Sequence, residues 1–367
     1  MKTITFFKQF ILCFTLGFMT LALSAQSIIT IDNNPNSTTT YTTIQDALDN
    51  ASNNDIIYVQ PSNSTYGNAI ISKPITIIGR SHSETAKIST LGTISVRSSN
   101  VELKGLSTST ISYSLTGAPV APPFVGFRLY ECEVNSSVSL GTFNVPADDV
   151  ELSGNILRGG VIVDDTASNV EISNNILLSS LTTQHTLTLT VRNNIFRGTS
   201  SISITNNDPA DGTLILFDNM FTINWNNNGF VNLNNGPFNL TNNLTYNFSF
   251  ASLDFQSNAS GSFTETGSLS NTNPLFTNVD DSISQSFAGT SSAYDSAFRP
   301  EDDLTLQAGS PALTTGTGGE QIGLFNSGFN FEKLGNPRGL PSLDITNYDG
   351  AVPKNGNINV TVTSKAY

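Results

Sequence analysis

The chain of 367 residues contains 16 lysine and arginine residues against 29 aspartate and glutamate residues, and its formal net charge at pH 7 is −13. An acidic surface repels nucleic acid and anionic lipid, and the sequence has no basic cluster to overcome that repulsion. Nucleic acid is therefore excluded as a partner. The low share of charged residues, 12%, and the many Ser, Thr and Asn residues suit an exported protein.

The first 25 residues predict a secretory signal. Lys2 and Lys8 lie ahead of an apolar run, FILCFTLGFMTLA, and small residues follow it. The run has about 13 residues, which is too short for a comfortable membrane span. We expect cleavage after Ala25, no integral membrane segment in the mature chain, and a location that is extracellular, on the cell surface or in the periplasm. An uncleaved anchor is the alternative.

Residues 41–51, YTTIQDALDNA, predict a helix. Thr43 followed by Asp46 is a variant of the capping box. One apolar face follows the i, i+3, i+4, i+7 spacing, through Ile44, Ala47, Leu48 and Ala51. Three short β-rich runs come next, DIIYVQP, GNAIIS and PITIIGR, separated by turn residues. We expect this helix to cover the open end of a strand stack, where unpaired edges would otherwise promote aggregation.

A short phrase recurs between about residues 100 and 245. Alternating apolar and polar residues precede an Asn, and two or three apolar residues follow it, as in VELSGNILRG, VEISNNILLS and TVRNNIFRG. The aligned Asn residues are about 20–25 residues apart, a period that is typical of a solenoid. They are Asn155, Asn175, Asn194, Asn219 and Asn243.

Each phrase is too short to bury its apolar residues alone, so successive coils must share one interior. We expect one residue of each phrase to point inward, namely Leu152, Ile172, Val191, Leu216 and Leu240. The Asn residues can adopt the left-handed conformation of a tight bend and pair with one another in a stack. Asn-rich loops of an ordinary β-sandwich are the alternative. Cys132 occupies the Asn position of an earlier copy, where we expect a buried and unreactive thiol.

Two regions interrupt the repeat. Residues 112–126 contain Pro119, Pro122 and Pro123 and must leave the strand ladder, and residues 245–300 predict less regular coils with long loops. The expected organisation is a signal over 1–25, one domain over 26–325, and a segment over 326–367 that folds back along the solenoid or caps its C-terminal end.

The opening YTTIQDALDNASNNDIIYVQPSNSTYGNAIISKPITIIG resembles that of right-handed parallel β-helix proteins of the pectin-lyase-like superfamily. The stretch NPLF and the later DDLTLQAGSPALTTGTGGEQIGLF are similar to the closing coil of secreted members. The resemblance covers about residues 27–325 and implies an all-β right-handed parallel β-helix with an N-terminal capping helix. It does not fix an activity, because this fold hosts lyases, hydrolases, epimerases and adhesins.

Lyases of this family need a Lys or Arg base, often with calcium held by carboxylates, so the resemblance implies calcium as the one cofactor to consider. Arg158 and Arg197 each lie three residues after a ladder Asn, about 10 Å apart across two coils, and Arg192 lies two residues before one. The base would remove the proton α to a uronate carboxylate, and cations would neutralise the enolate. Nearby carboxylates are Glu131, Glu133, Glu151, Glu171, Asp164 and Asp165. Solvated charges that only keep the exterior soluble are the alternative reading.

Other catalytic classes find less support. Paired aspartates occur, but without the companion motifs of the β-helix polygalacturonases. His82 and His185 have neither metal-ligand spacing nor a partner nucleophile, and we expect both at the surface.

A non-catalytic role in binding or scaffolding carbohydrate is the leading hypothesis, with a polysaccharide or surface glycan as partner. Trp225, Tyr130 and Tyr246 are the aromatic residues that could stack on sugar rings. The binding residues that we expect are Glu131, Glu151, Glu171, Asp164, Asp165 and Trp225. A polysaccharide lyase acting by β-elimination through Arg158, Arg192 and Arg197 is the alternative.

Overall fold

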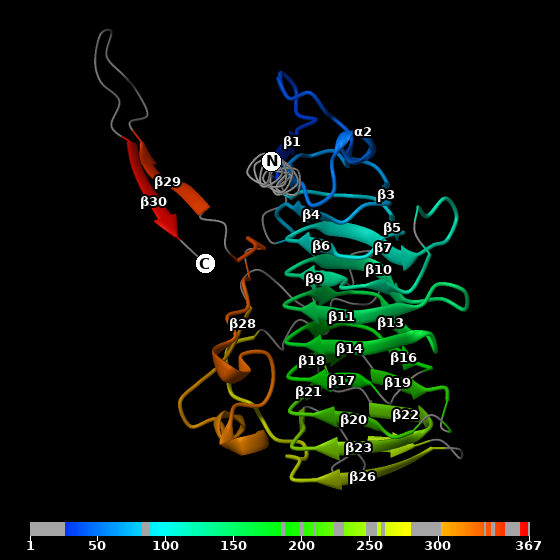
Figure 1. Cartoon of the computed structure of the whole chain (residues 1–367). Helices are drawn as coiled ribbons and strands as arrows, with labels where there is room; N and C mark the ends of the chain where they lie inside the picture. The colour runs from blue at the N-terminus through cyan, green and yellow to red at the C-terminus, as the bar shows by residue number, and fades with distance from the viewer. Residues whose placement is uncertain are drawn as a thin grey trace, which may run out of the picture.

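Parallel strands stack coil upon coil into a β-solenoid in this computed structural model (Figure 1). The structure describes residues 26–82, 88–119, 121–184, 188–198, 202–208, 210, 212–223, 231–246, 255–257, 261–279, 302–333, 335–338, 342–348 and 360–365. The predicted signal, His185 and Trp225 lie outside the described residues.

One long side of the solenoid is a 12-stranded parallel sheet. Every coil from the first to the last contributes a strand to it, so neighbouring strands are about 4.8 Å apart. In stacking order its strands are β1 (Ile28–Ile31), β2 (Ile56–Val59), β4 (Ile75–Ile78), β6 (Val101–Lys104), β9 (Arg128–Tyr130), β11 (Ala147–Ser153), β14 (Ala167–Ser173), β17 (Leu189–Arg192), β20 (Leu214–Phe217), β23 (Pro237–Thr241) and β26 (Ser262–Thr266), with β8 (Phe124–Val125) beside β11.

The other sides belong to a 14-stranded sheet with two arms, which β10 (Glu133–Leu140) joins because it pairs with both β12 and β13. The short arm follows the Asn corner and consists of β12 (Ile156–Leu157), β15 (Ile176–Leu177), β18 (Ile195–Gly198), β21 (Met220–Ile223) and β24 (Leu244–Tyr246). The long arm consists of β3 (Ala69–Ile71), β5 (Ile94–Val96), β7 (Ser107–Tyr113), β10, β13 (Gly160–Val163), β16 (Leu181–Thr183), β19 (Ile202–Asn206), β22 (Val231–Asn235) and β25 (Phe255–Ser257).

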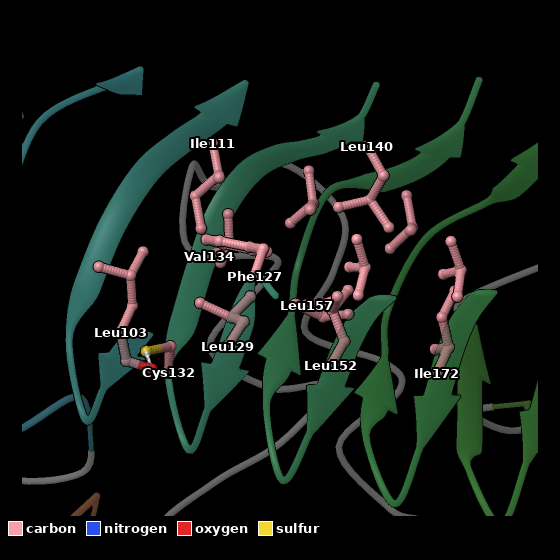
Figure 2. Close-up of a cluster of buried hydrophobic side chains, with 14 of the residues drawn as sticks. Leu103, Ile111, Phe127, Leu129, Cys132, Val134, Leu140, Leu152, Leu157 and Ile172 are labelled. Carbon is pink, nitrogen blue, oxygen red and sulfur yellow. Dashed lines mark hydrogen bonds between the residues drawn. The ribbon is translucent and has the colours of Figure 1, made fainter. Parts of the chain in front are cut away.

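The apolar residues of the repeat fill the interior, as the period-two pattern predicts. Figure 2 shows Leu103, Leu129, Leu152 and Ile172 stacked in one row, and each pairs in register with the next. Each of the five predicted inward residues, from Leu152 to Leu240, is fully buried. The long, low-charge coils thus bury one continuous core instead of several small ones.

The predicted Asn ladder is confirmed. Asn155, Asn175, Asn194, Asn219 and Asn243 are fully buried, and each side-chain oxygen accepts the backbone N–H of the preceding rung. Each Nδ2 of the first four donates to the Oδ1 of the next Asn, over 2.8–3.3 Å. Cys132 Sγ extends the row by accepting from the N–H of Leu106 over 3.4 Å.

The bend itself lies one residue earlier than we predicted. The residues just before the rungs have positive φ, whereas the rungs do not: Gly154 (73°), Asn174 (56°), Asn193 (57°), Asp218 (55°) and Asn242 (52°). A single left-handed residue bends the chain sharply between the two sheets, and the Asn that follows it is buried in the corner. We call these residues, together with Gly105 and Glu131 on earlier coils, the corner column.

The N-terminal end is closed by α2 (Ile44–Asn50), which confirms the predicted helix. Thr43 is its N-cap, and its hydroxyl accepts the backbone N–H of Asp46 over 3.2 Å. Ile44, Ala47 and Leu48 are buried in the solenoid core. The strand β1 ahead of the helix, which pairs with β2, is an element that the sequence pattern did not predict.

A segment that we call the strap, the described residues of 302–338, lies along the outside of the short arm (Figure 1). It begins with β28 (Asp303–Leu306), antiparallel to β27 (Phe276–Asn278), and continues through the short 3₁₀ turns Pro311–Leu313, Thr317–Gly319 and Asn326–Gly328. Its buried apolar residues are Leu304, Ala312, Ile322, Leu324 and Phe331. They pack on outward residues of the short arm, namely Ile156, Ile176, Ile195, Met220 and Leu244.

Beyond the strap, β29 (Ser342–Tyr348) and β30 (Val360–Lys365) form a separate antiparallel hairpin. The predicted boundary at residue 326 thus falls inside the strap, whose contacts with the solenoid begin before it. Within the described ranges, every helix is too short or too polar to cross a membrane.

Candidate functional site

Charged residues gather on the outer side of the 12-stranded sheet, over β6, β9, β11, β14 and β17. Alternate residues of each strand point outward there, because the inward ones fill the core. We call this surface the charged face, and it consists of Glu102, Lys104, Arg128, Tyr130, Asp149, Glu151, Glu171 and Arg192.

The cations of this face are held by carboxylates. Lys104 Nζ lies 2.7 Å from Glu102 on the same strand. Arg128 bridges two coils, because its Nη2 lies 2.7 Å from Asp149 and its Nε lies 3.7 Å from Glu151. All of these side chains are partly exposed, so the pairs fix geometry more than they stabilise the fold.

A third pair continues the pattern two coils further along the stack. Arg192 Nη2 lies 2.5 Å from Glu171 on the neighbouring strand, with about a third of each side chain exposed, 35% and 37%. Charges of both signs are therefore interspersed over the face and paired with one another, instead of forming a patch of one sign.

Tyr130 is the aromatic residue at the centre of the face. Its hydroxyl donates to Glu151 Oε2 over 2.7 Å, and Lys104 Nζ lies 5.7 Å from its ring centroid. Burial and the hydrogen bond to Glu151 raise the pKa of the Tyr130 phenol, so it stays protonated and acts as a donor. The ring is half-buried and held from both sides.

Two hollows adjoin on this face, because both are lined by β6, β9 and β11. The first has a volume of about 350 Å³ and its polar walls include Thr76, Glu102, Arg128 and Asp149. The second also has about 350 Å³ and is lined by Lys104, Tyr130, Glu131, Glu151, Ser153 and Arg338. Together they offer concave space beside an aromatic ring and several fixed polar groups.

The strap completes the second hollow. Glu131 belongs to the corner column, with φ of 55° and 2% exposure, and it accepts the backbone N–H of Arg338 over 2.6 Å. It also pairs with Arg338 Nε, and the guanidinium lies 4.3 Å from the ring centroid of Phe329. One wall of the hollow therefore comes from a residue 207 positions away in sequence.

The structure separates the three predicted arginines. Arg158 and Arg197 do lie in one row two coils apart, with Leu178 between them, but on the short arm. Both are largely buried: the Arg158 side chain is 12% exposed and pairs with Glu133 over 2.8 Å, and Arg197 is 3% exposed. Arg192 lies on the other sheet, so the three cations do not converge on one groove.

Of the predicted binding residues, Glu131, Glu151 and Glu171 lie on or beside the charged face. Asp164 and Asp165 lie in the turn between β13 and β14, at the edge where the strands of the 12-stranded sheet begin, and they line neither hollow. A hydrogen bond with Asp164, burial and the negative charge of Asp164 raise the pKa of Asp165. Trp225 is outside the described residues.

The sequence pattern missed Glu102, Lys104, Arg128, Asp149 and Arg338. The first four follow the same alternation that identifies the core, so the outward positions of VELK and of the strands after it would have found them. Arg338 carries no such signal, because only the fold brings the strap to this edge.

His82 is buried, contrary to the surface position that we expected. It is 3% exposed, its Nδ1 lies 2.7 Å from Ser81 Oγ, and its ring stacks on Phe331 of the strap at 6.1 Å. Phe331, which covers His82, belongs to the strap and lies far along the chain. Sequence motifs near His82 therefore do not indicate that it is buried. Cys132 is buried as predicted, and burial raises the pKa of its thiol to about 12.

No protein-family model matches this chain, and a search of curated proteins finds no similar sequence. Over the described part of the chain, no three His, Cys, Asp or Glu side chains are grouped as metal ligands.

Proposed function

We propose that the charged face binds carbohydrate without transforming it, in an exported protein of the pectin-lyase-like superfamily. The observation that carries this proposal is the second hollow, where Tyr130 presents a ring fixed by Glu151 and Lys104 within about 350 Å³ of concave space. Sugar rings stack on aromatic faces, and their hydroxyls pair with fixed polar groups at the rim.

The fold adds support for the family assignment but not for an activity. A parallel β-solenoid closed by an N-terminal helix agrees with the resemblance of the opening segment to that superfamily. Proteins with the same fold have different functions, so the evidence for binding or for catalysis must come from the side chains of the charged face.

The lyase alternative needs an exposed base with free space above it. Arg158 and Arg197 are largely buried on the short arm, and Arg192 on the open face is paired with Glu171. None of these positions combines an open surface with a side chain that is free to point at a substrate, which argues against proton abstraction by these residues. We therefore favour binding.

The test is a glycan array followed by calorimetry on the glycans that bind. We expect Tyr130→Ala to weaken binding about tenfold, since a stacked ring contributes roughly 1–1.5 kcal/mol. Phe143→Ala is the matched control, because Phe143 is 81% exposed and lies in a turn away from the charged face.

Equal affinities of both variants and the parent protein would exclude the Tyr130 hollow as the site. Acidic polysaccharides should be incubated with the protein in parallel and their ultraviolet absorbance followed. A rise from unsaturated uronate ends would establish β-elimination and reverse our preference for binding.

A further inference from the structure

The charge balance of the face bears on which glycans it can accept. The charged face and the walls of its two hollows contain four cations, Lys104, Arg128, Arg192 and Arg338. They contain five carboxylates, Glu102, Glu131, Asp149, Glu151 and Glu171. Every cation is in contact with a carboxylate, and one carboxylate is left in excess.

This arrangement disfavours an anionic ligand. A uronate carboxylate would have to displace a protein carboxylate from its cation, or lie beside the excess negative charge. Charges further away on a chain of net −13 reinforce the repulsion, although salt screens them over about 8 Å. An electrically neutral sugar meets neither cost.

The same ion pairs suit hydroxyl groups. A guanidinium has five N–H donors and a carboxylate has about four acceptor sites, so an Arg–carboxylate pair keeps donors and acceptors free side by side. A sugar hydroxyl both donates and accepts, and two neighbouring hydroxyls can span such a pair. Arg192 with Glu171 forms such a unit over β14 and β17. Arg128 with Asp149 forms a second one over β9 and β11 with fewer free donors, because Arg128 Nη1 donates to the carbonyls of Phe127 and Asp149.

We infer that the ligand of the charged face is an uncharged glycan, not a uronate polymer. This inference rests on the proposed function. The neutral ligand lies over β6, β9 and β11 with one ring on Tyr130, and its hydroxyls bind the paired side chains.

The test uses two oligosaccharides that differ only in charge: a galacturonan fragment and its carboxyl-reduced counterpart with the same linkages. We expect the reduced, neutral form to bind at least tenfold more tightly at low ionic strength. Added salt should narrow that difference, because it screens the repulsion of the acidic form.

Glu171→Gln makes the test specific to the charged face, because it removes one negative charge beside Arg192. It should reduce the ratio of the affinities for the neutral and the acidic oligosaccharide severalfold. Glu320→Gln, at an exposed position on the strap, is the control with the same change in net charge and should leave the preference intact. Tighter binding of the acidic form would overturn the inference and leave the proposed function standing. Binding of neither form, nor of any glycan on the array, would overturn both.

Discussion

Each rung of the Asn ladder satisfies polar groups that water cannot reach. Asn175 donates to the carbonyl of Leu152 over 2.8 Å, and its Oδ1 accepts the backbone N–H of Asn155 over 3.0 Å. We expect Asn175→Ala to lower the free energy of unfolding by about 2–4 kcal/mol, because it leaves several buried groups without partners. Urea denaturation measures this loss.

Asn144→Ala is the control for that variant. Asn144 is exposed in a turn, so its replacement should change stability by less than about 0.5 kcal/mol. If the two variants unfolded at the same urea concentration, the ladder would contribute nothing beyond the fit of the coils.

His82 makes the fold sensitive to acid. Burial, with the positive charge of Arg158 adding to it, lowers the pKa of His82 to about 3, whereas an unfolded chain has a histidine pKa of about 6.5. Between these values the unfolded state binds a proton that the folded state does not. Stability is therefore full above about pH 6.5 and falls as the pH drops toward 3, by up to about 1.4 kcal/mol per pH unit.

The measurement compares wild type with His82→Gln at pH 7 and pH 5. Wild type should lose about 2 kcal/mol more than the variant over this interval, since all other titrating groups are shared. Nuclear magnetic resonance gives a second readout, because the His82 imidazole should not titrate between pH 7 and 5. An imidazole that titrates near pH 6.5 would contradict the buried, neutral assignment.

The environment of a residue could be predicted from the sequence where the same residue type recurs in every coil. It could not be predicted where the neighbouring residue comes from a distant part of the chain. The ladder Asn was predictable because its apolar context recurs in every coil. The left-handed residue before it was not, because Gly, Asn, Asp and Glu all occupy that place and no single letter repeats. His82 appeared to be a surface residue because Phe331, which covers it, lies far along the chain.

At the scale of elements, the corner column anchors the strap. Asn242 Nδ2 donates to Thr317 Oγ1 over 3.2 Å, and Asp218 accepts the backbone N–H of Thr317 over 2.8 Å. Asn174 Nδ2 donates to the carbonyl of Leu324 over 2.9 Å, and Glu131 holds Arg338. A residue type chosen for its backbone conformation thus also provides the polar contact for a second element.

Close packing of the strap also explains a glycine. Gly105 has a φ of 56°, and a Cβ atom there would lie 2.8 Å from Cδ of Pro337. The left-handed backbone alone admits Asn, Asp or Glu elsewhere in the corner column, so it is the close approach of the strap that requires a residue without a side chain here.

Arg338→Gln should loosen the end of the strap. It leaves the carboxylate of Glu131 buried without its cation, at a cost of about 1–2 kcal/mol, which is less than for a fully buried pair because Arg338 is 39% exposed. Hydrogen exchange of residues 317–338 should accelerate about tenfold, while exchange in β11 and β14 stays unchanged.

Arg97→Gln, which removes a cation bound to Ser95 on the long arm, is the control. Unchanged exchange in the strap of the Arg338 variant, or faster exchange over the whole solenoid, would show that Glu131 and Arg338 do not fasten this segment. A segment that folds back along the solenoid was one of our two expectations for residues 326–367, but the contacts of the strap were beyond prediction from sequence, because its partners have no periodic relation to it. The helix at Ile44–Asn50 was predictable because its cap and apolar face are local.

At the scale of the whole molecule, the repeat determines the stack but not how its outer surfaces are used. The period of 20–25 residues predicts coils, and inward residues such as Leu152 predict the core. The outer surfaces then differ: the strap covers the short arm, and the 12-stranded sheet carries the paired charges. Of these two surfaces, only the charged one could be predicted from the sequence, once the outward positions of the strands are known.

The path of the strap has a consequence for how the solenoid comes apart. Stacked coils touch only their neighbours, so a solenoid can lose its coils one after another from either end. Here the strap runs backwards from Asn242 through Asn174 to Glu131, and Gly335 accepts the backbone N–H of Ser81 over 3.0 Å. A coil between these points can separate from the stack only after the strap is released, and distant coils also hold the strap. The strap therefore couples the coils that it contacts, so that they unfold as one cooperative unit.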